Sequence, residues 1–405
     1  MNKLDIALNE HVKELSDSGR AKGREQIVTE IIKASGEKGP RYRLEGSDLE
    51  YIKMNSNSYL GLSMHPEVIK AEEKATSEYG VGPGAVRFIS GSYKIHTDLE
   101  ETLAHFHGRE AAMIFSSAYM TSLGVISSLT TNETVVISDA LNHNCIINAM
   151  RMSRPVAKLI YAHNDMDDLK SKLLEAKEKG NRCLVITDGI FSMRGDHAPL
   201  DMIRRICDSA DSDFIEGVSL IVDDSHGVGA CGKTGRGTEE LTGGKADVLI
   251  GTLGKAFGVN GGYVTGSKEL VAFLREAAPT YIYSNPITVS ESAAARKSIE
   301  ICNSEAGLKR LKHLKDMTER FRRGLENIGL ETIPGQHPVV PLMVRDTKRT
   351  ANIVKHLLEN GVLATGLNFP VVPKGEEEIR FQINADHTEK DIDEALNILK
   401  NFTEK

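Results

Sequence analysis

The chain is poor in the features that mark several classes of protein. Its five cysteines are scattered and show no C-x-x-C spacing, so we expect neither a disulfide framework nor a thiolate metal site, and a reducing cytoplasm fits. No segment approaches the roughly eighteen consecutive apolar residues of a membrane helix. The N-terminus is polar and amphipathic rather than basic and then apolar, which predicts that the chain is neither secreted nor embedded in a membrane.

A long basic run is also absent. The 50 basic and 57 acidic residues leave a net charge of −7 and a pI of about 6.0. This balance argues against nucleic-acid partners and anionic membrane surfaces. At 405 residues, the chain can form one large or two medium domains around a sizeable core. These limits favour a cytoplasmic enzyme that acts on small molecules.

The order of apolar patterns predicts an α/β fold. Between about residues 100 and 270, near-continuous apolar runs alternate with helical patterns, as in a parallel sheet covered on both faces. The runs are AAMIFSS, TVVISDA, CLVITDGIF, VSLIVDDSH, VLIGTL and GGYVTG. Before them, apolar residues at helical spacing in 3–16 predict an amphipathic helix in an N-terminal arm.

A different pattern follows residue 290. A long amphipathic helix carries Leu311 to Ile328 and stops at Gly329, and the strands VVPLMV and EIRFQIN come after it. Thr388 and Asp391 have the spacing of a capping box before a closing helix. We therefore expect an N-terminal arm (1–50), a large domain (51–290) and a smaller α+β C-terminal domain (291–405).

One glycine-rich segment fits the nucleotide-binding pattern G-x-x-x-x-G-K-[ST], from Gly227 to Thr234. A phosphate-binding loop of this kind runs directly into a helix, whose first turn helps to hold the phosphates. Here Gly235, Arg236 and Gly237 follow Thr234, and the carboxylates that precede the loop would repel a triphosphate. An NTP-binding protein is thus a remote alternative.

The residues around this segment suit pyridoxal phosphate better. A carboxylate such as Asp223 can hold a pyridine nitrogen protonated, which makes the ring an electron sink. The next apolar strand leads to Lys255 in a loop of small residues, with Thr252 near enough to bind a phosphate. The combination of D-x-x-H, a following strand and G-T-L-G-K is more specific for pyridoxal phosphate chemistry than either motif alone. We expect Asp224, the neighbour of Asp223, at a solvated loop edge.

These segments resemble the α-oxoamine synthases, which are fold-type-I pyridoxal-phosphate enzymes that join an amino acid to an acyl-CoA. The resemblance runs from NSNSYLGLSMHPEV through GAVRFISGSYKIHTDLE, ISDALNHNCIINAMR, TDGIFSMRGDHAPL and VDDSHGVG to FPVVPKGEEEIRFQINADHT. It implies a large domain with a mostly parallel seven-stranded sheet, a smaller α+β domain, pyridoxal 5'-phosphate as cofactor and no metal.

The resemblance also assigns roles. Lys255 matches the Schiff-base lysine and Asp223 the partner of the ring nitrogen. The remaining assignments are His143 on the ring face, His226 and Ser192 near the phenolic oxygen, Ala118, Tyr119 and Thr252 at the phosphate, Asn57 and Arg380 at the substrate carboxylate, and Ser284 and Asn285 at the phosphate of a neighbouring subunit. The last pair implies a homodimer with a shared active site.

Within the family, SDALNH, VDDSHGVG and PVVPKG favour the members that use glycine and acetyl-CoA to give 2-amino-3-ketobutyrate. Alanine or serine with a longer acyl-CoA is the alternative, since no pattern fixes the volume around the acyl group. A catalytically silent member that serves as a partner subunit is disfavoured because Lys255, Asp223 and Arg380 are all in place. The sequence departs from the family at Arg194, where an acidic residue is usual, and at Val259 and Asn260, where small residues are usual.

Overall fold

The computed structural model describes residues 2–18, 20–21, 25–369 and 371–403. The chain divides into two compact units. The larger contains residues 57–316 and 334–338, and the smaller contains 1–56, 317–333 and 339–405. The larger unit extends past the boundary expected near residue 290 because helix α11 (Val289–Cys302) packs against α2 (Pro66–Tyr79) and α3 (Lys94–His107).

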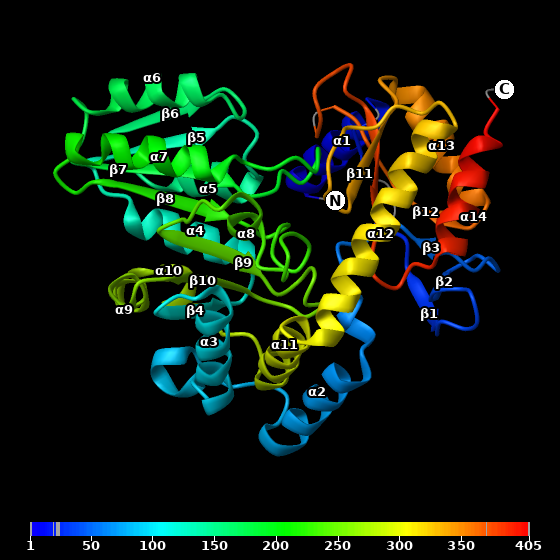
Figure 1. Ribbon diagram of the computed structural model, residues 1–405, viewed down its shortest axis with the longest axis horizontal. Helices are drawn as coiled ribbons and strands as arrows, with labels where there is room; N and C mark the ends of the chain where they lie inside the picture. Colours follow the sequence, from blue (N-terminus) through cyan, green and yellow to red (C-terminus); the bar gives the residue numbers. More distant parts are fainter. Residues whose placement is uncertain (1, 19, 22–24, 370, 404–405) are drawn as a thin grey trace. The chain divides into compact units, whose positions relative to one another are not determined.

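A seven-stranded sheet forms the centre of the larger unit (Figure 1). Its strands are β4 (Ala111–Phe115), β5 (Thr134–Asp139), β6 (Ala157–Tyr161), β7 (Arg182–Asp188), β8 (Val218–Asp223), β9 (Val248–Thr252) and β10 (Gly262–Gly266), in the spatial order β4-β10-β9-β8-β7-β5-β6. Strand β10 is antiparallel to both neighbours, and the other pairs are parallel. The predicted mostly parallel sheet is confirmed.

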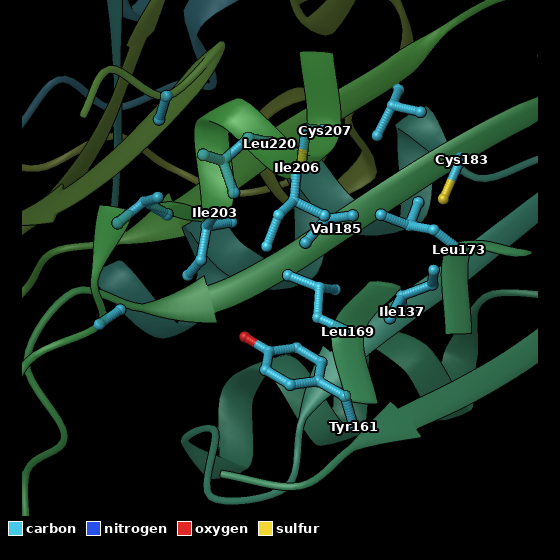
Figure 2. Close-up of a cluster of buried hydrophobic side chains, with 14 of the residues drawn as sticks. Ile137, Tyr161, Leu169, Leu173, Cys183, Val185, Ile203, Ile206, Cys207 and Leu220 are labelled. Carbon is cyan, nitrogen blue, oxygen red and sulfur yellow. The ribbon is translucent and has the colours of Figure 1, made fainter. Parts of the chain in front are cut away.

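Alternate residues of each central strand face opposite sides of the sheet, and helices cover both. On one side, Val185 and Leu220 pack with helices α6 (Met166–Ala176) and α7 (Leu200–Ala210), as Figure 2 shows. On the other side, Leu184 and Ile221 pack with α4 (Ala118–Leu129), α5 (Asn144–Met152) and α9 (Lys268–Ala277). Burial on both faces is the reason these strands are almost continuously apolar.

Shorter helical segments complete the larger unit. They are η1 (Leu62–Met64), η2 (Arg87–Gly91), η3 (Asp211–Asp213), α8 (Thr238–Thr242) and α10 (Pro279–Ile282). Helix α12 (Glu305–Asn327) begins in the larger unit and ends in the smaller one. The glycine expected to stop it, Gly329, has a φ of 78°, a left-handed value that suits glycine.

The smaller unit combines short sheets with helices. An antiparallel sheet has the order β11-β14-β13, formed by β11 (Val339–Met343), β13 (Thr365–Leu367) and β14 (Glu378–Gln382). Two further pairs are β1 (Val28–Ile32) with β2 (Arg41–Leu44), and β3 (Ile52–Lys53) with β12 (Val362–Leu363). Its helices are α1 (Lys3–Asp17), α13 (Thr347–Glu359) and α14 (Glu389–Lys400). Thus the predicted N-terminal helix, both predicted C-terminal strands and the closing helix are confirmed.

Local signals explain where the helices begin. Thr388 caps α14, and the reciprocal bonds between Thr388 and Asp391 form the predicted capping box. The carboxylate of Asp391 also pairs with Arg41 at 2.7 Å in the interior of the smaller unit. Within the described ranges, no helix is both long enough and apolar enough to span a bilayer.

Candidate active site

Asp223 lies at the carboxyl end of β8, the edge of a parallel sheet at which ligands bind in open α/β folds. Its side chain is buried. Ser122 Oγ donates to Asp223 Oδ2 at 3.0 Å, the Cys145 thiol points to the same oxygen at 3.6 Å, and the Ser225 backbone N–H donates to Oδ1 at 3.1 Å. Two side chains and one backbone N–H thus fix the orientation of the Asp223 carboxyl group.

Helix α4 begins beside this carboxylate. Ser117 caps the helix by accepting a bond from the Met120 N–H at 3.2 Å. The first-turn N–H groups of Ala118 and Tyr119 have no partner within the helix by geometry, and they lie at its positive end. A Cβ on Gly262 of β10 would lie 2.3 Å from the Ala118 nitrogen, so only glycine allows this close approach. The arrangement suits an anionic phosphate.

The predicted ring-stacking histidine, His143, caps helix α5. Its backbone N–H donates to Asp188 Oδ2 at 2.9 Å, and its Nδ1 lies 3.0 Å from the sulfur of Cys145. The ring of Tyr119 stands edge-on to the His143 ring with centroids 6.5 Å apart. Cys145 therefore touches both His143 and Asp223, and the two residues share one site.

His226 is held from two sides. Tyr59 Oη lies 2.7 Å from His226 Nδ1, and His337 Nε2 lies 2.9 Å from the His226 carbonyl oxygen. The Tyr59 hydroxyl also donates to Asn57 Oδ1 at 3.4 Å. The structure thus connects Asn57 to His226 through Tyr59, a residue that the sequence did not single out.

Lys255 follows β9, the strand next to β8, and is half-buried between Gly254 and Ala256. Its positive charge acts to lower the pKa of Asp188, against the larger effect of burial. Thr252 Oγ1 accepts a bond from the Gly254 N–H at 3.1 Å and donates to the Gly261 carbonyl oxygen at 3.3 Å. The threonine hydroxyl shapes the loop that carries the lysine.

Ser192 is buried in the loop that follows β7. In the same loop, Arg194 Nε lies 3.2 Å from Asp196 Oδ2, so the first departure from the family pattern is part of an ion pair with its own loop. At the second departure, the Val259 N–H donates to the Leu253 carbonyl oxygen at 3.0 Å, and Asn260 is exposed. That bond closes the loop around Lys255.

Three further predicted residues lie on other elements of the chain. Ser284 and Asn285 follow α10; Ser284 Oγ lies 3.4 Å from the Asn285 carbonyl oxygen, and Asn285 is exposed. Arg380 lies on β14 of the smaller unit, paired in register with Pro341 and Thr365.

Asp224 corrects one expectation. It is fully buried rather than solvated, and it accepts bonds from the Thr238 N–H at 2.7 Å and the Thr238 hydroxyl at 2.6 Å. Burial raises the pKa of Asp224 to about 7, although the two bonds from Thr238 oppose the rise. Cβ atoms on Gly189, Gly227 or Gly237 would lie within 2.2 Å of this carboxylate. Asp224 therefore organises the glycine-rich loop from inside.

The nucleotide-like segment does not form a phosphate-binding loop. The next helix, α8, is five residues long, and three residues separate it from the end of the pattern. The carboxylate of Glu240 accepts bonds from the N–H groups of Thr234 and Arg236 at 2.9 and 3.2 Å, and from the Thr234 hydroxyl at 2.8 Å. A side chain of the protein thus takes the position that a phosphate would need.

Sequence reasoning overlooked Tyr59, Ser122 and Asp188. Asp188 ends β7 in the run TDGIF just as Asp223 ends β8, so the rule that singled out Asp223 could have found it. Ser122 lies one helical turn after Ala118 inside an apolar helix, where nothing in the sequence distinguishes it. Tyr59 follows NSNS, and its partner His226 lies 167 positions away.

The donor set fits pyridoxal phosphate. The donors to the Asp223 carboxyl group are a hydroxyl, a thiol and a backbone N–H, and a protonated pyridine nitrogen would supply a cation beside it. The first turn of α4 offers N–H groups to a phosphate, and Lys255 offers an amine. Asp223, the α4 N-terminus, His143 and Lys255 all belong to the larger unit.

Comparisons with known proteins agree with this fit. The family model for aminotransferase class I and II matches residues 50–399. The mitochondrial 2-amino-3-ketobutyrate coenzyme A ligase of Bos taurus is 39% identical over 392 residues, covering 96% of this chain and 90% of the relative. The 8-amino-7-oxononanoate synthase of Thermosipho melanesiensis is 39% identical over 347 residues, covering 85% and 86%.

Solved structures show the same fold. Serine palmitoyltransferase of Sphingomonas wittichii superposes with a TM-score of 0.86 at 26% identity, over 98% of this chain and 96% of that one. A structure of SPT with PLP gives the same TM-score and identity over 99% and 98%. By sequence and by fold, the chain belongs to the aminotransferase class I and II family, in which it is an α-oxoamine synthase of fold type I, a group of enzymes that depend on pyridoxal 5'-phosphate.

Proposed function

We propose that the chain condenses glycine with acetyl-CoA to give 2-amino-3-ketobutyrate and free CoA, with pyridoxal 5'-phosphate as cofactor. The observation that carries the proposal is the setting of Asp223. This buried carboxylate has three hydrogen-bond donors, which are a hydroxyl, a thiol and a backbone N–H. It ends β8, and the loop after the adjacent strand β9 carries Lys255.

The choice of glycine and acetyl-CoA rests on the relatives and on the motifs. Human mitochondrial 2-amino-3-ketobutyrate coenzyme A ligase is 40% identical over 361 residues. The relatives called 8-amino-7-oxononanoate synthase are 36–39% identical, which is as close. The motifs SDALNH, VDDSHGVG and PVVPKG favour the first kind. Alanine or serine with a longer acyl-CoA is therefore the second candidate.

In this proposal, each residue of the site has a separate role. Asp223 holds a proton on the ring nitrogen, and its three hydrogen-bond donors fix the position of the carboxyl group. His143 covers one face of the ring and excludes water. Ala118 and Tyr119 bind the phosphate through their backbone N–H groups. Thr252 supports the loop that presents Lys255. When bound, pyridoxal phosphate supplies an electron sink for the pair of electrons left by the departing Cα proton.

Lys255 Nζ takes that proton from the Cα of glycine. A carbon–carbon bond then forms between Cα and the acetyl carbonyl carbon, and the carbon–sulfur bond of the thioester breaks. The released thiolate takes up a proton, so the proton lost from Cα is balanced by the one gained by CoA. His226 and Ser192 are proposed to hold the phenolic oxygen in place through this sequence.

Three further assignments complete the proposal. Arg380, with Asn57, receives the substrate carboxylate, since a guanidinium binds a carboxylate through two parallel bonds. Ser284 and Asn285 reach the cofactor phosphate of a second copy, which makes the functional form a homodimer. The five cysteines are all unpaired and buried, which is consistent with a reducing compartment such as the cytoplasm.

A substrate panel tests the proposal. Purified protein is saturated with pyridoxal phosphate and supplied with glycine, alanine or serine, each paired with acetyl-CoA or a longer acyl-CoA. Release of CoA is measured as free thiol. The highest kcat/KM is expected for glycine with acetyl-CoA. A preference for alanine and a long acyl chain would support the second candidate, and no release with any pair would refute both.

Lys255→Ala provides the mechanistic control. It removes the amine and is expected to abolish turnover while pyridoxal phosphate still binds through its phosphate. Lys233→Ala is the matched variant, since Lys233 is an exposed lysine in the nucleotide-like segment and has no part in the proposal. Normal turnover by the Lys255→Ala protein would rule out the assignment.

A further inference from the structure

Two acidic side chains end neighbouring strands at the candidate site. Asp188 ends β7 and Asp223 ends β8, and their Cα atoms are partners in the parallel ladder. Adjacent strands lie about 4.8 Å apart, and register partners direct their side chains to the same face. Both are buried, with 4% and 5% of their surface exposed. Two buried carboxylates this close repel each other if both are ionised.

The two carboxyl groups differ in the number of their hydrogen-bond donors. Asp223 has the Ser122 hydroxyl, the Cys145 thiol and the Ser225 N–H as donors. The Asp188 side chain has a single donor, the backbone N–H of His143 at 2.9 Å. Because hydrogen-bond donors stabilise the ionised form of a carboxylic acid, Asp188, which has a single donor, is the one of the two that favours the neutral acid.

The charged groups that face Asp188 agree with this assignment. Burial is the largest influence, and together with the negative charges of Asp223 and Asp139 it holds the pKa of Asp188 well above its usual range. Lys255 acts in the opposite direction. However, Lys255 is the amine used by the proposed reaction, so it is no permanent counter-ion for Asp188.

Asp188 also fixes the turn that carries His143. The Asp188 backbone N–H donates to Asn142 Oδ1 at 2.8 Å, while its side chain accepts from the His143 N–H. Asn142 Nδ2 in turn donates to Ser138 Oγ and to the Ile186 carbonyl oxygen, both at 2.8 Å. The turn before α5 is thus tied to the ends of β5 and β7 through Asp188 and Asn142.

We propose that Asp188 is a positioning residue that is kept as a neutral carboxylic acid: it orients His143 through the backbone and leaves Asp223 as the single anion facing the cofactor. The inference rests on the proposed function for the use of the site. The protonation of Asp188 itself depends only on the described contacts.

The first test reads protonation directly. Infrared difference spectra are recorded at neutral pH between the pyridoxal-phosphate-loaded wild type and its Asp188→Asn variant. The wild type is expected to show the carbonyl stretch of a protonated carboxylic acid that the variant lacks. Asp208→Asn, which changes an exposed carboxyl group on α7, is the matched control and should leave that band in place. A spectrum with only ionised-carboxylate bands assigned to Asp188 would overturn the proposal.

The second test separates the neutral form from the charged form by activity. Asn keeps an acceptor oxygen for the His143 N–H, so Asp188→Asn should lower kcat/KM by less than about ten-fold, whereas Asp188→Ala should lower it by about a hundred-fold. Asp223→Asn should lower it more than Asp188→Asn does. If Asp188→Asn is as damaging as Asp188→Ala, the positioning role by a neutral acid is wrong.

Unfolding measurements keep the outcomes distinguishable. An acid with a raised pKa in the folded state costs stability as pH rises, so Asp188→Asn should become progressively more stable than the wild type between pH 5 and pH 8. A pH-independent difference would contradict the neutral acid. Because the infrared and unfolding readouts need no substrate, they decide the state of Asp188 even if the substrate panel refutes the proposed reaction.

Discussion

Replacing His163 tests how the loops of the candidate site are held. His163 follows β6, and its two ring nitrogens reach two carboxylates: Nδ1 lies 3.0 Å from Asp139 Oδ1, and Nε2 lies 3.1 Å from Asp196 Oδ2. The ring stands edge-on to Phe191 with centroids 4.4 Å apart. Asp139 precedes the turn of His143, and Asp196 lies in the loop of Ser192, so His163 joins both loops.

The size of the effect follows from the charge of His163. Burial lowers the pKa of His163, but the hydrogen bonds and charges of Asp139 and Asp196 outweigh it and raise the pKa to about 9 from an ordinary value of 6.5. One pKa unit corresponds to about 1.4 kcal/mol, so the shift is worth about 3 kcal/mol at most. Since Asp196 is partly exposed and solvent screens it, we expect about 2 kcal/mol.

The sign of the pH dependence is fixed by the direction of this shift. A pKa raised in the folded state gives stability that is fully present below pH 6.5 and is lost as pH rises towards 9. His163→Gln should therefore lower the free energy of unfolding by about 2 kcal/mol at pH 6, and the difference from wild type should shrink at pH 9.

The assay is urea unfolding at pH 6, 7.5 and 9. It is followed by circular dichroism because the chain has no tryptophan. His105→Gln is the control, since His105 is an exposed histidine on α3 of the same unit. A loss of stability that is equal at all three pH values would refute the charge-based argument. The loss of stability would then be explained by the lost packing of the His163 ring against Phe191 alone.

Other consequences can be tested on the same protein. Asp223→Asn should lower kcat by about a hundred-fold or more, or about 3 kcal/mol in the barrier, and a wild-type rate would contradict its role at the ring nitrogen. Gly262→Ala adds a Cβ at 2.3 Å from the Ala118 nitrogen, so it should weaken pyridoxal phosphate binding at least about ten-fold in an absorbance titration; Gly82→Ala, which adds its Cβ in open space, should not. ATP should give no binding heat in calorimetry with the wild type, and micromolar binding that Lys233→Ala removes would restore the nucleotide hypothesis.

The sequence predicted the strands that have a buried, apolar environment on both faces. Six strands of the large sheet are continuous apolar runs because both of their faces are covered. Strand β6 lies at the edge of the sheet, where Lys158 and Ile160 are exposed. The composition of β6 therefore does not predict a buried strand. The expected number of seven strands came from the family resemblance and not from the pattern of apolar runs.

The contacts of the site were harder to predict because they join distant residues. Nothing in the local sequence distinguishes the environment of Asp223 from that of Asp224. Thr238, fourteen positions after Asp224, holds the Asp224 carboxylate inside the loop. The same holds for Tyr59 and its partner His226. Local composition indicates which residue types occur at a strand end, but the partner of each side chain is set by the path of the chain.

Glu240 gives the nucleotide-like segment a ligand of its own. The carboxylate is joined to the amides of Thr234 and Arg236 by fewer than seven residues of chain. Its effective concentration at these amides is on the order of millimolar or higher, as for any short tether. A free phosphate would have to compete with this intramolecular anion and also approach its negative charge. Glu240 therefore blocks anion binding by this segment, although the sequence of the segment fits the nucleotide-binding pattern at every position.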